Sequence, residues 1–187
     1  LAGGSREIPG ESGIFRSTDG GETWTPVLTG SAGTDLVFDP TNGSTAYAAI
    51  GRGTGDLKYG VFKSTDAGLT WTASNGTGAT ALPTTGGARI AMAISPSSPS
   101  TLYISMATTA STLRGVFKTV DGARTWTQLP PPDYCAPQCP YDNVIRVHPR
   151  SSNVAVPSAD PFRPLHTSGV DRTLPVGTPW AAPFLGV

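Results

Sequence analysis

Short runs of apolar, β-branched and aromatic residues alternate with polar positions along most of the chain, and turn-forming residues separate them. The run Val61-Phe62 is followed by alternating polar residues, by the segment Ser64-Thr65-Asp66-Ala67-Gly68 and by a closing Thr-Trp-Thr. β-branched and aromatic residues favour strands, whereas Asp and Gly favour tight turns. Residues 60–72 are therefore predicted to form a strand, a turn and a returning strand.

The same pattern occurs three times. Residues 13–24 and 115–126 repeat residues 60–71 with few changes. The Asp of each turn can accept hydrogen bonds from downstream backbone N–H groups, and glycine adopts a positive φ without steric cost. The Trp of each returning strand has a large apolar face to bury, so we expect it to pin the hairpin to its own sheet.

The spacing of the tryptophans gives the repeat length. Trp24, Trp71, Trp126 and Trp180 follow one another at intervals of 47, 55 and 54 residues. Repeats of roughly 40 to 50 residues with four strand signals each are typical of propeller blades. The predicted fold class is all-β, a β-propeller of four-stranded antiparallel blades.

A second strand pair is expected before each hairpin. Pro40, Pro96 and Pro149 each follow an apolar run, and the runs begin at residues 36, 90 and 144. Proline cannot donate a hydrogen bond to a neighbouring strand, so each proline is expected to end a strand and open a short turn.

The number of repeats predicts a partial propeller. The twelve residues before the first copy leave no room for the two strands expected there, and prolines interrupt the pattern from residue 154. The chain is thus predicted to hold two whole blades and parts of two others, with an irregular tail at 154–187. Radial closure needs at least about four blades, so residues 1–187 are expected to be a fragment of one larger propeller chain.

The pattern Ser/Thr-x-Asp-x-Gly-x-Thr-Trp resembles the Asp-box, or BNR repeat, of β-propeller proteins. The third copy departs from it, because Ala123 stands in the glycine position and Gly122 lies one place early. The resemblance implies that each box lies between the third and fourth strands of a blade, remote from the ligand site. It assigns structural roles to the box residues Ser17, Asp19, Gly21, Trp24, Ser64, Asp66, Gly68, Trp71, Asp121 and Trp126.

Composition narrows the possible partners. The chain has 13 Lys and Arg against 13 Asp and Glu, with 23 Gly and 18 Pro. This balance gives no electrostatic reason to expect nucleic acid as a partner, and no apolar run approaches the roughly 18 residues of a membrane span. The sequence contains no phosphate-binding loop, so we expect no cofactor.

The connections between strands differ in length, and this difference predicts where a ligand would bind. The long ones are residues 51–59, 73–88, 107–114 and 129–143. In an up-and-down blade they all lie at one end, around the mouth of the central channel. Function usually resides in loops on a rigid scaffold, so this end is the predicted site.

Several residues of these loops are candidates for chemistry. A glycosidase needs two carboxylates about 5 to 10 Å apart, and tyrosines can stack on sugar rings while arginines bind anionic groups. Solvated loop acids and ordinary packing of the tyrosines are the alternative interpretation. The acids are Asp56, Asp133 and Asp142, and the proposed ligand-binding residues are Arg52, Tyr59, Arg114, Tyr134 and Tyr141.

Cys135 and Cys139 lie in one proline-rich loop. A disulfide, two free thiols or a metal site would each fit this pair. Zinc needs four ligands, and His148 and His166 lack ligand spacing, so no metal is expected. A disulfide would agree with an extracellular or periplasmic location.

Two enzyme families share the Asp-box, and neither can be matched residue by residue. Sialidases require an arginine triad and a tyrosine paired with a glutamate, whereas the glutamates here are Glu7, Glu11 and Glu22. Xyloglucan-cleaving glycoside hydrolases divide their catalytic aspartates between two propellers. Sortilin-type receptors and photosystem assembly factors use such repeats for binding.

The sequence therefore favours a secreted, bacterial repeat scaffold that binds a carbohydrate or protein ligand over an enzyme. The alternative is a fragment of a glycoside hydrolase, sialidase-like or xyloglucanase-like, whose catalytic set is incomplete in this chain.

Overall fold

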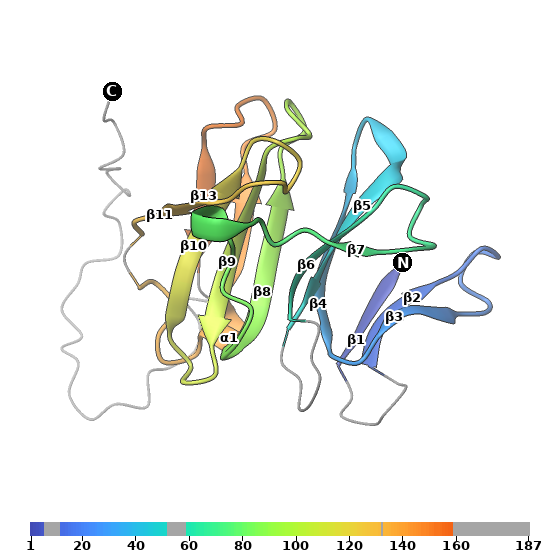
Figure 1. The fold of residues 1–187 in the computed structure, drawn as a ribbon, viewed down its shortest axis with the longest axis horizontal. Helices are drawn as coiled ribbons and strands as arrows, with labels where there is room; N and C mark the ends of the chain where they lie inside the picture. Colours follow the sequence, from blue (N-terminus) through green and yellow to red (C-terminus); the bar gives the residue numbers. More distant parts are fainter. Residues whose placement is uncertain (6–11, 52–58, 132, 159–187) are drawn as a thin grey trace, which may run out of the picture.

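The computed structural model describes residues 1–5, 12–51, 59–131 and 133–158, which form four antiparallel sheets side by side (Figure 1). Two sheets have four strands, in the orders β4-β5-β6-β7 and β11-β10-β9-β8, and they are flanked by the sheet β1-β2-β3 and the pair β12-β13. We call them blade 2, blade 3, blade 1 and blade 4. Two single-turn helices complete the described part of the chain, η1 (Gly78–Thr80) and α1 (Cys139–Asp142).

The strand bounds follow the repeat. Blade 1 contains β1 (Ala2–Ser5), β2 (Ser12–Arg16) and β3 (Thr25–Thr29). Blade 2 contains β4 (Gly33–Asp39), β5 (Asn42–Ile50), β6 (Gly60–Ser64) and β7 (Thr72–Ala73). Blade 3 contains β8 (Gly87–Ile94), β9 (Leu102–Thr108), β10 (Leu113–Thr119) and β11 (Thr127–Leu129), and blade 4 contains β12 (Val144–Val147) and β13 (Ala155–Ser158).

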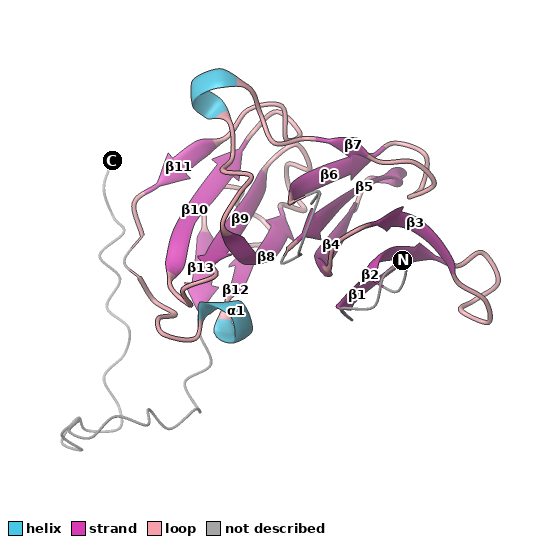
Figure 2. Ribbon diagram, turned by 60° about the horizontal axis from the view of Figure 1, so that its bottom comes forward, coloured by secondary structure: helices cyan, strands magenta, loops and turns pink. Residues whose placement is uncertain are grey.

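This arrangement confirms the predicted all-β, partial propeller of four-stranded antiparallel blades. The inner strands β4, β8 and β12 are neighbours, and each blade extends outward from its inner strand (Figures 1 and 2). Three hydrogen bonds join β4 to β8. The Thr34 hydroxyl donates to the Ile90 carbonyl at 3.0 Å and accepts the Ile90 amide at 3.3 Å, and the Met92 amide donates to the Asp35 carboxylate at 2.7 Å.

The two ends of the described chain compare differently with the sequence prediction. β1 pairs with β2 in register from Ala2↔Phe15 to Ser5↔Ser12, so one strand precedes the first copy where no room for two was expected. Ala155–Ser158 forms β13 against β12, although an irregular segment was predicted from residue 154. Pro157 is tolerated there because β13 has no second partner among the described strands, and an edge strand can lack one N–H donor. Residues 159–187 lie outside the described residues.

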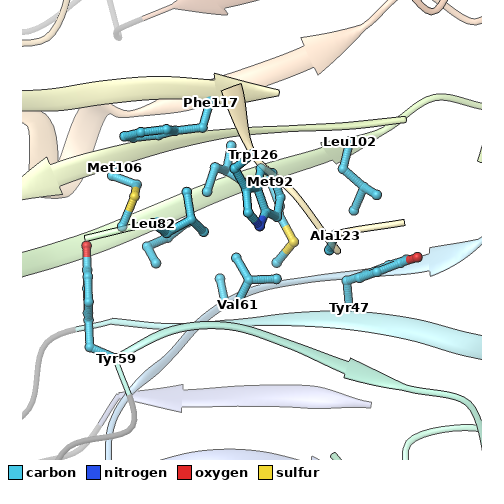
Figure 3. Packing of buried hydrophobic residues seen from close by; sticks show 13 residues of the cluster. Tyr47, Tyr59, Val61, Leu82, Met92, Leu102, Met106, Phe117, Ala123 and Trp126 are labelled. Carbon is cyan, nitrogen blue, oxygen red and sulfur yellow. The ribbon is translucent and has the colours of Figure 1, made fainter. Parts of the chain in front are cut away.

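Adjacent blades bury a continuous core between them. Residues 45–50 of β5 and residues 102–107 of β9 are all buried. Each of these two strands is covered on both faces by a neighbouring blade. Between blades 2 and 3, Val61 and Tyr47 face Met92, Leu102 and the ring of Trp126 (Figure 3). Leu82 enters this core from the β7–β8 connection.

A basic side chain from each of β2, β6 and β10 reaches the next blade. Arg16 Nε donates to the Ala67 carbonyl at 3.0 Å, and Lys63 Nζ donates to the Gly122 carbonyl at 3.4 Å. Lys118 Nζ donates to the Asn153 side-chain oxygen at 3.1 Å. Lys63 and Lys118 also lie over tyrosine rings of their own blades, at 5.3 Å from the ring centre in both cases. We call these three contacts the interblade bridges.

The three repeat turns, residues 17–24, 64–71 and 119–126, share one hydrogen-bond pattern. In the second, the Ser64 hydroxyl donates to Asp66 at 2.7 Å and accepts the Gly68 amide at 2.8 Å. The Asp66 carboxylate accepts the Thr70 hydroxyl at 2.5 Å and the Thr70 amide at 2.9 Å. Asp19 and Asp121 make the equivalent contacts in the other turns, so all three aspartates cap turns.

Two consecutive residues of each repeat turn have a positive φ, which explains the departure of the third copy. Each turn places at least one glycine in this pair, and alanine takes the other place in two of them. The amide of Ala123 still donates to the Thr119 hydroxyl at 3.1 Å. The φ values are +75° and +98° at Gly20 and Gly21, +59° and +82° at Ala67 and Gly68, and +69° at both Gly122 and Ala123.

The tryptophans of the three repeat turns lie in different surroundings. Trp24 and Trp71 each donate their indole N–H to a carbonyl of their own turn. Trp126 instead donates to the Ser74 carbonyl of the preceding blade at 3.0 Å. Trp126 is 4% exposed, whereas Trp24 is 45% exposed, because Trp24 has no preceding blade beside it among the described residues.

The left-handed alanine predicts a stabilising substitution. Ala67→Gly should raise the free energy of unfolding by about 0.5–1 kcal/mol, because only glycine adopts a positive φ without strain. The matched control is Ala73→Gly in the exposed strand β7, which should lower it by about 0.5–1 kcal/mol. Urea unfolding of both variants measures the difference, and a loss of stability in Ala67→Gly would contradict the strain at this position.

The aspartate caps predict a dependence on pH. Hydrogen bonds from the Thr70 hydroxyl and amide and from the Ser64 hydroxyl lower the pKa of Asp66 to about 2. The unfolded chain therefore takes up the proton first, so the stabilisation is full above pH 4 to 5 and is lost as the pH falls towards 2. Urea unfolding of the wild type and Asp66→Asn between pH 2 and 6 should show a gap that narrows on acidification. A gap of constant size would contradict the role of the charge.

Candidate functional site

Long connections meet at one end of the blades and the repeat turns at the other. At the turn end, the Ala67 amide donates to the Ser44 carbonyl at 2.8 Å. At the long-loop end, the Thr109 amide donates to the Gly86 carbonyl at 3.4 Å and the Cys139 amide to the Ser111 carbonyl at 3.3 Å. The start of the 73–88 connection does not lie with the long loops, because the Ser74 carbonyl accepts the Trp126 indole N–H of the third repeat turn.

A disulfide joins Cys135 to Cys139 in the β11–β12 connection, and both residues are buried. Asp133 lies at the start of this loop, where its exposed carboxylate accepts the amides of Ala136 at 3.1 Å and Leu113 at 3.3 Å. Asp133 and the two sulfurs form a cluster, but sulfurs in a disulfide are not the thiolates that bind metals. Asp133 therefore caps its own loop.

Tyr134 fixes the same loop to blade 3. Its hydroxyl is hydrogen bonded to the Ser105 hydroxyl and donates to the Asn143 side-chain oxygen at 2.8 Å. Asn143 is buried and donates to the Ser105 carbonyl at 2.9 Å. Burial raises the pKa of the Tyr134 hydroxyl. The ring is half-buried, so it positions the loop more than it offers a stacking surface.

Tyr59 lies in the core between blades 2 and 3 (Figure 3). Its ring covers Gly87, where a Cβ atom would come within 1.9 Å of it. Burial raises the pKa of Tyr59 to about 12, against a smaller opposing effect of the Arg114 charge. Its buried hydroxyl has no hydrogen-bond partner in the described part of the chain. Arg114 itself donates to the Thr85 carbonyl.

Three residues lie together at the long-loop end, where the sequence predicts the mouth of the channel. Tyr141 is 69% exposed, and its carbonyl accepts Arg89 Nη1 at 3.5 Å. The Asp142 carboxylate makes no hydrogen bond with the residues that the structure describes. Both lie on α1, which packs against β8, the inner strand that carries Arg89. We call Arg89, Tyr141 and Asp142 the mouth patch.

Sequence reasoning missed Arg89. Its Nε atom is buried and unpaired within residues 1–5, 12–51, 59–131 and 133–158. The sequence did contain one signal for Arg89. It is a charged residue inside the apolar run 87–94, and it lies at the end of that strand which is nearest the long loops. Of the other predicted residues, Arg52 and Asp56 lie outside the described residues.

An exposed tyrosine next to a guanidinium can stack on a sugar ring or on an apolar side chain while the guanidinium binds an oxygen. Of the two described candidate acids, Asp133 is bound within its loop and Asp142 is open. No cluster of His, Cys, Asp or Glu other than the one around the disulfide occurs in the described segments, and none of their helices is long and apolar enough to cross a membrane.

Known structures resemble the chain in fold. The GH74 enzyme of Niastella koreensis is 28% identical with a TM-score of 0.53, over 77% of this chain and 21% of its own. An ancestral GH74 enzyme is 20% identical with a TM-score of 0.54, over 74% of this chain and 18% of its own, which shows the fold alone. The chain thus spans about a fifth of the length of these enzymes.

Sequence comparison identifies the family. No curated protein matches the chain. The family model of the DUF6242 beta propeller domain matches residues 8–156, which is most of the described structure. The chain belongs to the DUF6242 beta propeller domain family.

Proposed function

We propose that this chain is part of a larger, secreted propeller of the BNR/Asp-box type and that its mouth patch binds a carbohydrate. The observation that carries the proposal is Tyr141, a large aromatic side chain that is 69% exposed beside Arg89 at the channel mouth. An exposed aromatic ring on a rigid scaffold has little structural reason to stay exposed, and ligand contact provides one.

The BNR/Asp-box assignment is supported by the repeat turns. All three have the same aspartate cap, including the third copy with its displaced glycine. In that family the boxes lie away from the ligand, which agrees with a mouth patch at the opposite end from the turns.

Secretion is supported by the cysteine pair. Cys135 and Cys139 are joined and buried, and structural disulfides persist in oxidising compartments such as the periplasm and the extracellular space. A bacterial exported protein is the source that best fits this combination.

Binding is favoured over catalysis because of the acids. Hydrolysis of a glycosidic bond needs two carboxylates flanking it in most families. The Asp133 carboxylate accepts one amide of its own loop and one from the start of β10. Asp142 is the described candidate acid whose carboxylate makes no hydrogen bond to the described residues. A protein ligand is the other class that an exposed tyrosine and an arginine would suit.

A second candidate function is a segment of a glycoside hydrolase. It is favoured by the likeness to the Niastella koreensis GH74 enzyme at 28% identity and by the open carboxylate of Asp142. In this case the partner acid would come from elsewhere in a longer chain. Release of reducing ends from xyloglucan, abolished in Asp142→Asn, would support this function, and an inactive wild-type chain would count against it.

The binding proposal predicts an effect of one side chain. Tyr141→Ala should weaken binding of a xyloglucan oligosaccharide about tenfold, because a ring covered by a sugar contributes roughly 1–2 kcal/mol. Tyr141→Phe should bind like the wild type, since stacking needs only the ring. Isothermal titration calorimetry measures both.

The matched control is Val120→Ala, which removes an exposed apolar side chain from a repeat turn at the other end. Its affinity should equal that of the wild type. Equal weakening in Val120→Ala and Tyr141→Ala, or no binding of xyloglucan or cello-oligosaccharides by the wild type, would contradict carbohydrate binding at the mouth patch.

A further inference from the structure

An open groove of about 430 Å³ lies between blades 2 and 3, next to the repeat turns and away from the mouth patch. Its walls are strand β7 with the following residues 74–77 on one side and residues 122–124 of the third repeat turn on the other. Ligand sites usually measure about 300 to 1,000 Å³, so the groove is large enough for a small oligosaccharide. A second cavity, beside Arg114, is smaller at about 180 Å³.

The groove is built by an extended connection. Thirteen residues, 74–86, join β7 to β8, whereas residues 30–32 suffice between β3 and β4. Its wall is held in place from both blades, because the Ser74 carbonyl accepts the Trp126 indole N–H at 3.0 Å and the Asn75 side chain accepts the Val61 amide at 2.7 Å. A ligand would therefore meet a surface that is already ordered, which reduces the entropy cost of binding.

The charge of the groove is positive. Lys63 and Arg124 line it, and no carboxylate is among the residues that line it. Lys63 uses one of its three N–H groups on the Gly122 carbonyl, and the exposed Arg124 guanidinium makes no hydrogen bond within the described part of the chain. The nearby Asp66 carboxylate is occupied by its own turn.

The remaining surface of the groove is rich in hydroxyl groups. Thr65, Thr72, Ser74 and Thr77 line it, and their hydroxyls make no hydrogen bonds to other described residues. Hydroxyls donate and accept, as do the hydroxyls of sugars. The combination of two cations with free hydroxyls matches a ligand that carries both an oxyanion and several hydroxyl groups.

We infer that this groove is a binding site for an acidic saccharide, whose carboxylate or sulfate is bound by Arg124 and Lys63 while its hydroxyls pair with the threonines and Ser74. The site is separate from the mouth patch and does not depend on the proposed function, because it uses different residues at the opposite end of the blades.

Isothermal titration calorimetry with trigalacturonate, galactotriose and inorganic sulfate tests the inference. Trigalacturonate should bind, and the neutral galactotriose and free sulfate should each bind at least tenfold more weakly, because each lacks one half of the ligand chemistry. A sulfated galactotriose in place of trigalacturonate distinguishes a sulfate from a carboxylate, and tight binding of either acidic sugar supports the site.

Two variants localise the binding. Arg124→Gln should weaken trigalacturonate binding about tenfold or more, since a hydrogen bond to a charged group is lost, and Thr72→Val should weaken it without changing the charge. The matched control is Arg150→Gln, which removes an exposed arginine from the β12–β13 turn and should have wild-type affinity.

Four results would each overturn the inference. These are no binding of either acidic sugar, equal binding of galactotriose, equal binding of inorganic sulfate, and equal weakening by Arg124→Gln and Arg150→Gln. Circular dichroism of each variant confirms that a loss of affinity reflects the groove and not the fold.

Discussion

The contact between adjacent blades is the constraint on which the rest of this structure depends. A blade cannot bury both faces of its own sheet. The middle strands β5 and β9 are buried on both faces, so each needs a neighbouring blade on either side. The interblade bridges add directional hydrogen bonds to this apolar packing. Each places a cation from β2, β6 or β10 on the next blade, and the bridges from Arg16 and Lys63 end on carbonyls of the next repeat turn. The aspartate cap that shapes a repeat turn thus also positions the carbonyl that accepts the cation of the preceding blade.

This arrangement separates the two ends of the molecule. The turn end carries the caps and the bridges, so its residues are committed to holding blades together. The long-loop end is fixed by the disulfide and by Tyr134, and Tyr141 is exposed there with its carbonyl bound by Arg89. The groove beside Arg124 is the exception at the turn end, and residues 74–77 of the long β7–β8 connection form one of its walls.

The sequence predicts the blades and the capped turns because these depend on local residues. The repeat turns need Asp, a hydroxyl and positive φ within a few positions, and the third copy keeps all three although its glycine is displaced. The site is less predictable because it depends on contacts between distant segments. Tyr59 was expected at a surface and is buried against Gly87, while Arg89 was hidden in an apolar run. Likewise β13 forms despite Pro157, because a strand at the edge of a sheet does not need the backbone N–H that proline lacks.

Amide hydrogen exchange of Lys63→Met tests the interblade bridges most directly. The account predicts faster exchange at the amides of Ala123 to Thr125, in the repeat turn of the next blade, and unchanged exchange at Gly68 to Thr70 in the turn of its own blade. The companion variant Lys118→Met should spare both turns and affect residues 151–154, where its own bridge ends. Faster exchange confined to the turn of its own blade in Lys63→Met, or wild-type exchange throughout, would contradict a turn held by the preceding blade.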